Sequence, residues 1–246
     1  MLGIRAAFRK IYSGPDVVFK HLVLCFVGGI GTIFAVQYEA FKHGGQVIGN
    51  GLLYLMILGF CVLFFVMPWI VGYMLELCHN SFDDRKSHIL PELSFSYIGD
   101  FYRALPLFFC WGFLYPLIMI LSLAVITGML LPKTIAVFVC VPIILIYTIS
   151  PMFIYIRYSK DYDTSDLYNP MLPFKFVLPT IINVILLSFN LSIIAFLVFL
   201  GVGLITRFHL PENVMYVVTG YLSTIFYFVF AFCLVQIYRE KLVYIE

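Results

Sequence analysis

Charge is what this chain has least of. Lys, Arg, Asp and Glu make up 11% of its 246 residues, whereas 63% of the residues are hydrophobic. A typical soluble domain carries about 25% charged residues, so this composition excludes an ordinary soluble protein. The formal net charge is only +2. The basic residues also form no continuous track. The small net charge and the missing track together exclude nucleic acid as the partner.

The few charges also leave long gaps. Six apolar runs contain no charged residue, and they predict membrane spans at residues 22–38, 52–75, 105–131, 135–156, 177–205 and 214–237. A helix needs about 20 apolar residues to cross a hydrocarbon core of about 30 Å. Because buried ions and unpaired backbone groups are costly in lipid, we predict an all-α membrane protein with six transmembrane helices. The segments between the spans are too short for a soluble domain, so residues 1–246 form a single polytopic membrane domain embedded in the lipid bilayer.

The loops predict the orientation of these spans. An even number of spans places both termini and the loops 76–104 and 157–175 on one side. That side carries twelve of the fifteen basic residues and eleven of the thirteen acidic ones. Short loops rich in Lys and Arg stay in the cytoplasm. We therefore expect a multi-pass protein of the inner or plasma membrane with cytoplasmic termini and a charged cytoplasmic face.

Catalytic and metal-binding motifs are missing as well. The sequence has no nucleophile elbow, no HExxH, no P-loop and no His–carboxylate pair inside a span. Its six cysteines show no CxxC spacing and no histidine at a metal-ligand interval. We therefore expect no enzymatic activity, no cofactor and no metal.

Glycine and proline occur inside the spans. The run Gly28-Gly29-Ile30-Gly31 lies in the first span, where close helix packing is the natural use of glycine. Prolines within or bordering spans remove a backbone donor and kink a helix, and neighbouring groups can repair the loss. These prolines are Pro68, Pro106, Pro116, Pro142 and Pro151.

The chain also resembles three repeated units, each an interfacial helix followed by a helical hairpin. The three opening segments are residues 4–12, 95–105 and 171–179. A short segment with one charged and one apolar face is suited to the headgroup plane. The alternative is that any alternation of spans and loops looks periodic.

The fifth and sixth spans contain the most polar intramembrane positions. Thr180, Asn183 and Asn190 share one helical face, because they lie at i, i+3 and i+10. Thr219 and Tyr227 of the sixth span could pair with these amides. Two interpretations remain open: the amides hold the two helices together, or they line a polar path or ligand site.

The loop at residues 76–104 is the segment richest in charge. Glu92, Asp100 and Arg103 are its candidate docking residues, and Asp100 and Arg103 belong to the amphipathic segment 95–105. The alternative interpretation is an ordinary solvated loop.

Three short motifs and an N-terminal pattern resemble one known family. The motifs are Gly72-Tyr73, Leu90-Pro91-Glu92 and Gly99-Asp100-Phe101, and the pattern is Ala7-Phe8 ahead of Gly28-Gly29. Together they resemble domain-of-unknown-function family 4013. The chain departs from that family's pattern in having no tryptophan in residues 94–97 and no glycine at 103–104. The resemblance implies a prokaryotic integral membrane protein, with no activity to transfer.

Two functions are consistent with these features. The first is a non-enzymatic membrane protein whose charged cytoplasmic face binds lipids or a cytoplasmic or membrane protein partner. The second is a transporter or permease subunit with a polar path along the fifth and sixth spans. The absence of acidic residues inside the spans disfavours ion-coupled transport.

Overall fold

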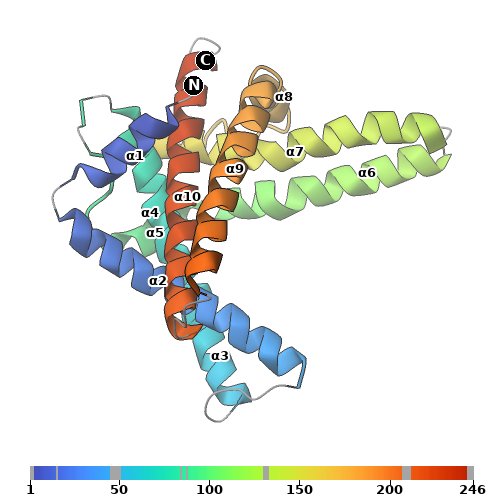
Figure 1. The fold of residues 1–246 in the computed structure, drawn as a ribbon. Coiled ribbons are helices and arrows are strands. Elements are labelled where there is room, and N and C mark those ends of the chain that lie inside the picture. Colours follow the sequence, from blue (N-terminus) through green and yellow to red (C-terminus); the bar gives the residue numbers. More distant parts are fainter. Residues whose placement is uncertain are drawn as a thin grey trace.

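The computed structural model describes residues 3–14, 16–44, 51–83, 85–86, 88–129, 133–206 and 212–242, and within these ranges it contains helices and no strand (Figure 1). Two of the helical segments, η1 and η2, are single π-helical turns inside longer helices. The elements are α1 (Ile4–Tyr12), α2 (Val17–Lys42), α3 (Leu52–Cys61), η1 (Val62–Val66), α4 (Met67–Phe82), α5 (Ser96–Phe109), η2 (Cys110–Leu114), α6 (Tyr115–Met129), α7 (Lys133–Asp161), α8 (Leu172–Val177), α9 (Ile181–Thr206) and α10 (Glu212–Lys241).

Six helical stretches are long and apolar enough to cross a membrane, which confirms the predicted fold class. Four of them fall in α2, α7, α9 and α10. The other two are composite, because α3, η1 and α4 form one continuous stretch and α5, η2 and α6 form another. The stretches are Val17–Lys42, Leu52–Phe82, Ser96–Val125, Cys140–Asp161, Ile181–Gly203 and Val217–Lys241.

The three predicted opening segments differ from one another. Residues 4–12 form the separate helix α1, and residues 171–179 contain the short helix α8. Residues 95–105 are instead the first turns of α5, which continues through η2 into α6. The threefold repeat stays a prediction.

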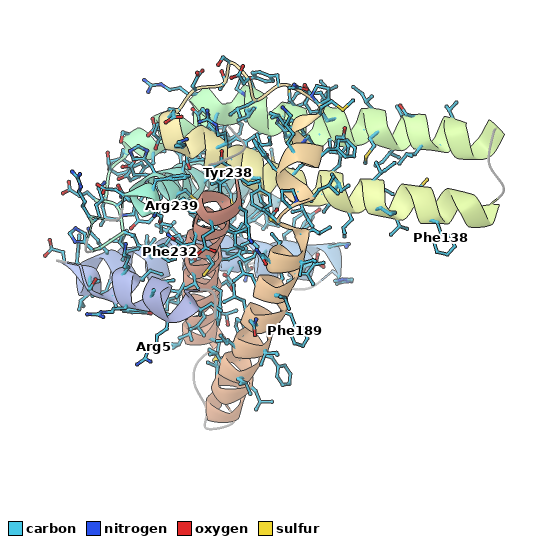
Figure 2. The ribbon with its side chains drawn as sticks, turned by 90° about the horizontal axis from the view of Figure 1, so that it is seen from above. Arg5, Phe138, Phe189, Phe232, Tyr238 and Arg239 are labelled. Carbon is cyan, nitrogen blue, oxygen red and sulfur yellow. The ribbon has the colours of Figure 1, made fainter. Side chains whose placement is uncertain are left out.

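Helix α10 is the centre of the molecule. It contacts α1, α2, α4, α7 and α9. The pair α6–α7 projects sideways, at a wide angle to α9 and α10 (Figure 1). Phe232 and Tyr238 of α10 lie in the packed centre, whereas Phe138 of α7 and Phe189 of α9 point outward with 76% and 64% of their surface exposed (Figure 2). The core therefore lies where the helices converge, whereas α7 of the projecting pair and the outer side of α9 expose apolar surface suited to lipid.

The α2–α10 contact depends on two glycines. Gly28 and Gly220 face each other, and a Cβ added to Gly220 would lie 2.8 Å from the Gly28 carbonyl oxygen. Thr32 and Thr224, each four residues further on, donate hydrogen bonds to these two glycine carbonyls. Small residues at such crossings let helix backbones approach closely in a membrane. The predicted use of the glycine run for close packing is confirmed for Gly28 and Gly29, whereas Gly31 faces open space.

Two span prolines have their freed carbonyls satisfied by hydroxyl groups. Pro68 cannot donate to the carbonyl of Phe64, and the Tyr102 hydroxyl donates to it instead at 3.2 Å. Pro151 similarly frees the carbonyl of Tyr147, which accepts from the hydroxyl of Ser150 at 2.9 Å. Such repair allows a helix to contain proline at membrane depth.

Candidate functional site

Two adjoining cavities gather the polar groups at the end where the helices converge. The first, here called the Lys20 cavity, has a volume of about 890 Å³. Its polar side chains are Asp16, Lys20, Glu76, Asn80, Lys86, His88, Glu92 and Tyr97. The second, the Arg103 cavity, has a volume of about 510 Å³. It is lined by Glu76, Asp100, Arg103, Tyr158, Tyr162 and Thr164. Glu76 belongs to both cavities, so together they form one polar face.

One face of α4 holds the loop that closes the Lys20 cavity. The indole Nε1 of Trp69 donates to the carbonyl of Ser94 at 2.8 Å, and the hydroxyl of Tyr73 donates to that of Pro91 at 3.3 Å. Asn80 donates from Nδ2 to the carbonyl of residue 89 at 3.4 Å. Because residues 88–94 belong to no helix, their carbonyls have no helical partners, and these side chains supply them. The three donors and Glu76 lie at i, i+4, i+7 and i+11, which places them on one side of the helix.

The second loop is held in the same way. Trp111 of η2 donates from Nε1 to the carbonyl of Leu167 at 2.7 Å. The hydroxyl of Tyr115 donates to the carbonyl of residue 168 at 2.5 Å, and that of Tyr147 to the carbonyl of residue 170 at 3.1 Å. Trp111 and Tyr115 are one turn apart, so they reach the loop from one side of the helix. Residues 162–171 are therefore fixed against the spans by polar aromatic side chains.

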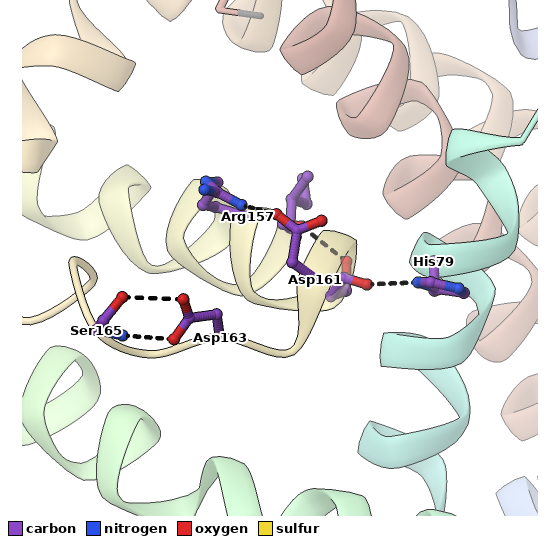
Figure 3. Close-up of polar contacts among 7 residues, drawn as sticks. His79, Arg157, Asp161, Asp163 and Ser165 are labelled. Carbon is purple, nitrogen blue, oxygen red and sulfur yellow. Dashed lines mark hydrogen bonds and ion pairs between the residues drawn. The ribbon is translucent and has the colours of Figure 1, made fainter. Parts of the chain in front are cut away.

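Tyr162 connects the two loops at the shared wall. Its hydroxyl donates to Glu76 Oε2 at 2.8 Å, and its ring lies 5.5 Å from that of His79. His79 Nδ1 is in turn 2.9 Å from the carbonyl oxygen of Ser159 (Figure 3). Tyr162 has a φ of 55°, a left-handed conformation that is strained for a bulky residue and needs such contacts to persist. Burial, and secondly the hydrogen bond to Glu76, raise the pKa of Tyr162.

The end of α7 and the loop after it carry local polar contacts. Arg157 and Asp161 form an ion pair of 2.5 Å one turn apart (Figure 3). Asp163 accepts hydrogen bonds from the backbone N–H and the hydroxyl of Ser165, at 3.0 and 2.9 Å. These bonds lower the pKa of the exposed Asp163 carboxyl. Asp163 therefore orders the turn at residues 163–165.

The three predicted docking residues all reach the polar face. Asp100 and Arg103 line the Arg103 cavity and lie 3.6 Å apart, from Oδ1 to Nη1. The Arg103 side chain is 81% exposed and that of Asp100 26%. Glu92 lines the neighbouring Lys20 cavity. The structure thus brings Asp100 and Arg103 together and places Glu92 one cavity away.

The predicted polar residues of the fifth span bond to their own backbone. Thr180 donates to the carbonyl of residue 176 at 2.6 Å, and Asn190 donates to that of residue 186 at 2.7 Å. Asn183 is half-buried. Asn190 also lines a cavity of about 1250 Å³ between α1 and α9, together with Arg5 and Arg9.

The predicted contact between the fifth and sixth spans is present, but other hydroxyls face each other across it. A groove of about 400 Å³ between α9 and α10 is lined by Ser188, Ser192, Ser223 and Tyr227. Thr219 is half-buried and is not among the groove residues. Ser188 and Ser192 were missed, although they lie one turn apart on a single face of α9.

Sequence reasoning also missed Lys20, because the first span was expected to begin at residue 22. Lys20 lies in the first turn of α2 and lines a cavity of the polar face. Nor did the sequence indicate that tryptophan and tyrosine would hold the loops, since the loop carbonyls come near them only through tertiary packing. In the described ranges, no group of three or more His, Cys, Asp or Glu side chains could hold a metal ion.

Comparison with known proteins identifies no relative of this chain. No protein-family model matches the chain, and neither a curated protein nor a solved structure matches it. The resemblance to family 4013 stays a prediction from the sequence motifs.

Proposed function

We propose that this chain is a non-enzymatic, multi-pass protein of the cell membrane that acts through a charged cytoplasmic face binding protein partners or lipids. One observation carries the proposal: two polar cavities meet at Glu76, and their loop walls are fixed by side chains from the spans. Such preorganisation lowers the cost of ordering a binding surface. The excess of Lys and Arg in the loops of this face supports its cytoplasmic placement.

The Arg103 cavity is the part of this face suited to a protein partner. The Arg103 side chain projects into solvent, and its ion pair with Asp100 joins residues three apart on the helix surface. Exposed pairs of this kind contribute about 0–1 kcal/mol to stability. The protein can therefore exchange the pair for contacts with a partner at little cost, and arginine is enriched at interfaces.

The test compares two matched ion pairs. We expect the double variant Asp100→Ala and Arg103→Ala, purified in native nanodiscs, to lose a partner that accompanies the wild type. The control is Glu39→Ala with Lys42→Ala, another exposed pair three residues apart in α2, at a distance of 3.9 Å. The control should retain the partner. If mass spectrometry finds the same components with both double variants and the wild type, docking at this cavity is wrong.

Transport is the second candidate, and the cavities along α9 favour it. Asn190 shares a cavity with two arginines of α1, and the groove beside Tyr227 is lined with serine hydroxyls. If these form a path, Asn183→Leu with Asn190→Leu should abolish uptake of a labelled polar solute into cells while folded yield stays unchanged. A matching loss of folded yield would assign the amides to helix packing instead.

A further inference from the structure

The Lys20 cavity contains a buried positive charge. The Lys20 side chain is only 7% exposed, and it lies in the first turn of α2, next to the positive end of the helix dipole. Its Nζ makes one long hydrogen bond of 3.4 Å, to the carbonyl oxygen of Leu90. Within the described ranges no carboxylate lies within 4 Å of it. A buried ammonium group needs a charged or strongly polar partner, so this position favours an anionic ligand.

The other walls of the cavity narrow the chemistry of that ligand. Lys86 adds a second ammonium group, which donates to Asn80 Oδ1. Asp16, Glu76 and Glu92 line the same cavity. A purely anionic ligand would face these three carboxylates, and a purely cationic one would face Lys20. A ligand with both a phosphate and a primary amine satisfies both sets of charges.

An apolar track leads away from the cavity. Phe19 lines the cavity, and Phe19, Leu22 and Phe26 follow one side of α2 at i, i+3 and i+7. All three side chains are exposed. The track runs along α2, which is apolar enough to span the membrane, and Lys20 lies at the polar end of this helix. Acyl chains can therefore lie on the track while a headgroup occupies the cavity.

We propose that the Lys20 cavity binds the headgroup of an aminophospholipid of the phosphatidylethanolamine type. The phosphate contacts Lys20 and Lys86, the primary amine faces the carboxylates, and the acyl chains follow Phe19 and the track after it. This inference depends on the proposed function, because it names a lipid as one ligand of the charged face. It concerns a different cavity from the Asp100–Arg103 pair, so the two proposals fail separately.

The test uses the full-length protein, delipidated in detergent and titrated with single lipids. Native mass spectrometry should show phosphatidylethanolamine retained about tenfold better than phosphatidylcholine, whose headgroup has no hydrogen-bond donor, or phosphatidylglycerol, whose headgroup has no cation for the carboxylates. Lys20→Met should abolish this preference. Lys42→Met, at the exposed opposite end of the same helix, should leave it intact.

Two further measurements separate the alternatives. Without lipid, Lys20→Met should melt at the same temperature as the wild type or higher, because it removes a buried charge and keeps the apolar stem. A lower melting temperature with an unchanged lipid preference would show that Lys20 only holds the loop at Leu90, and would overturn the proposal.

Soluble phosphoethanolamine should bind much more weakly than the lipid. Equal binding would assign the site to a soluble phosphate compound and overturn the lipid assignment, as would equal retention of all three lipids.

Discussion

At the scale of single residues, polar aromatic side chains connect the spans to the loops. Both tryptophans of the chain donate their indole N–H to loop carbonyls, and three tyrosines of the spans donate their hydroxyls in the same way. An aromatic ring with one polar atom suits this position, because its body packs in the apolar core while its donor reaches the interface. The shape of the polar face therefore depends on a few hydrogen bonds.

Removing one of these donors should loosen a loop. Trp111→Phe keeps an aromatic ring but leaves the buried Leu167 carbonyl without its partner, which costs about 1–3 kcal/mol. We expect a lower melting temperature in detergent and faster proteolysis within residues 162–171. Phe113→Leu, an exposed position in the same π-helical turn, is the control. Equal stability of the two variants would contradict the role given to the indole.

Gly72 should not tolerate even alanine. A Cβ at this position would collide with the backbone carbonyl of Tyr97, and neither backbone can move without separating α4 from α5. We expect Gly72→Ala to destabilise the protein by about 1–3 kcal/mol or more, as overpacking does. Gly99→Ala is the control in α5, because a Cβ there meets open space. Removing a helical glycine at that position should stabilise by about 0.5–1 kcal/mol. Similar melting temperatures for both variants would be evidence against the close contact.

Tyr162 gives the polar face a dependence on alkaline pH. Its pKa is raised in the folded protein, so its contribution to stability is complete below the usual tyrosine pKa of about 10. As the pH rises above that value, the unfolded state loses its phenolic proton first and the contribution declines. The stability difference between wild type and Tyr162→Phe should therefore shrink above about pH 10. Chemical unfolding in detergent at a series of pH values measures it, and a constant difference would contradict the buried hydrogen bond to Glu76.

At the scale of elements, hydropathy predicted the spans and tertiary contacts decided their details. A run of about 17–25 apolar residues specifies a spanning helix without reference to its neighbours, so all six stretches could be predicted. Whether residues 95–105 form a separate helix or continue into the third span, as they do in α5, depends on packing against α4, which the sequence does not display. The same holds for the π-helical turns η1 and η2. Spacing alone likewise placed Asn190 on one polar face with Thr180 and Asn183. In the structure the Asn190 amide instead donates to the backbone of its own helix.

The crossing of α2 and α10 gives a prediction at this scale. Gly220→Ala would place a Cβ 2.8 Å from the backbone of Gly28, so the two helices must separate. We expect a loss of about 1–3 kcal/mol, because helix association in a membrane depends on close packing. Gly31→Ala, in α2 but facing open space, should melt at the wild-type temperature or slightly above it, because it removes a helical glycine without a clash. A wild-type melting temperature for Gly220→Ala would mean that this crossing is looser than described.

At the scale of the whole molecule, packing and charge concentrate at the same end. The buried core surrounds the last turns of α10, and the Lys20 and Arg103 cavities open beside it. The projecting pair α6–α7 and the outer side of α9 expose apolar residues such as Phe138 and Phe189, as lipid-facing helices do. This division fits a protein that is anchored by its hairpins and acts through one polar face. The charge counts predicted which side carries that face, whereas the cavities depend on contacts between residues far apart in the sequence.

The central claim is that loops 76–104 and 157–175 form one face on the cytoplasmic side. Side-specific labelling with an impermeant maleimide tests it directly. In a variant without native cysteines, Arg103→Cys and Asn169→Cys should react only in inside-out vesicles, and Lys42→Cys only in intact cells. Reaction of Arg103→Cys and Asn169→Cys from opposite sides, or of both from outside, would contradict the account.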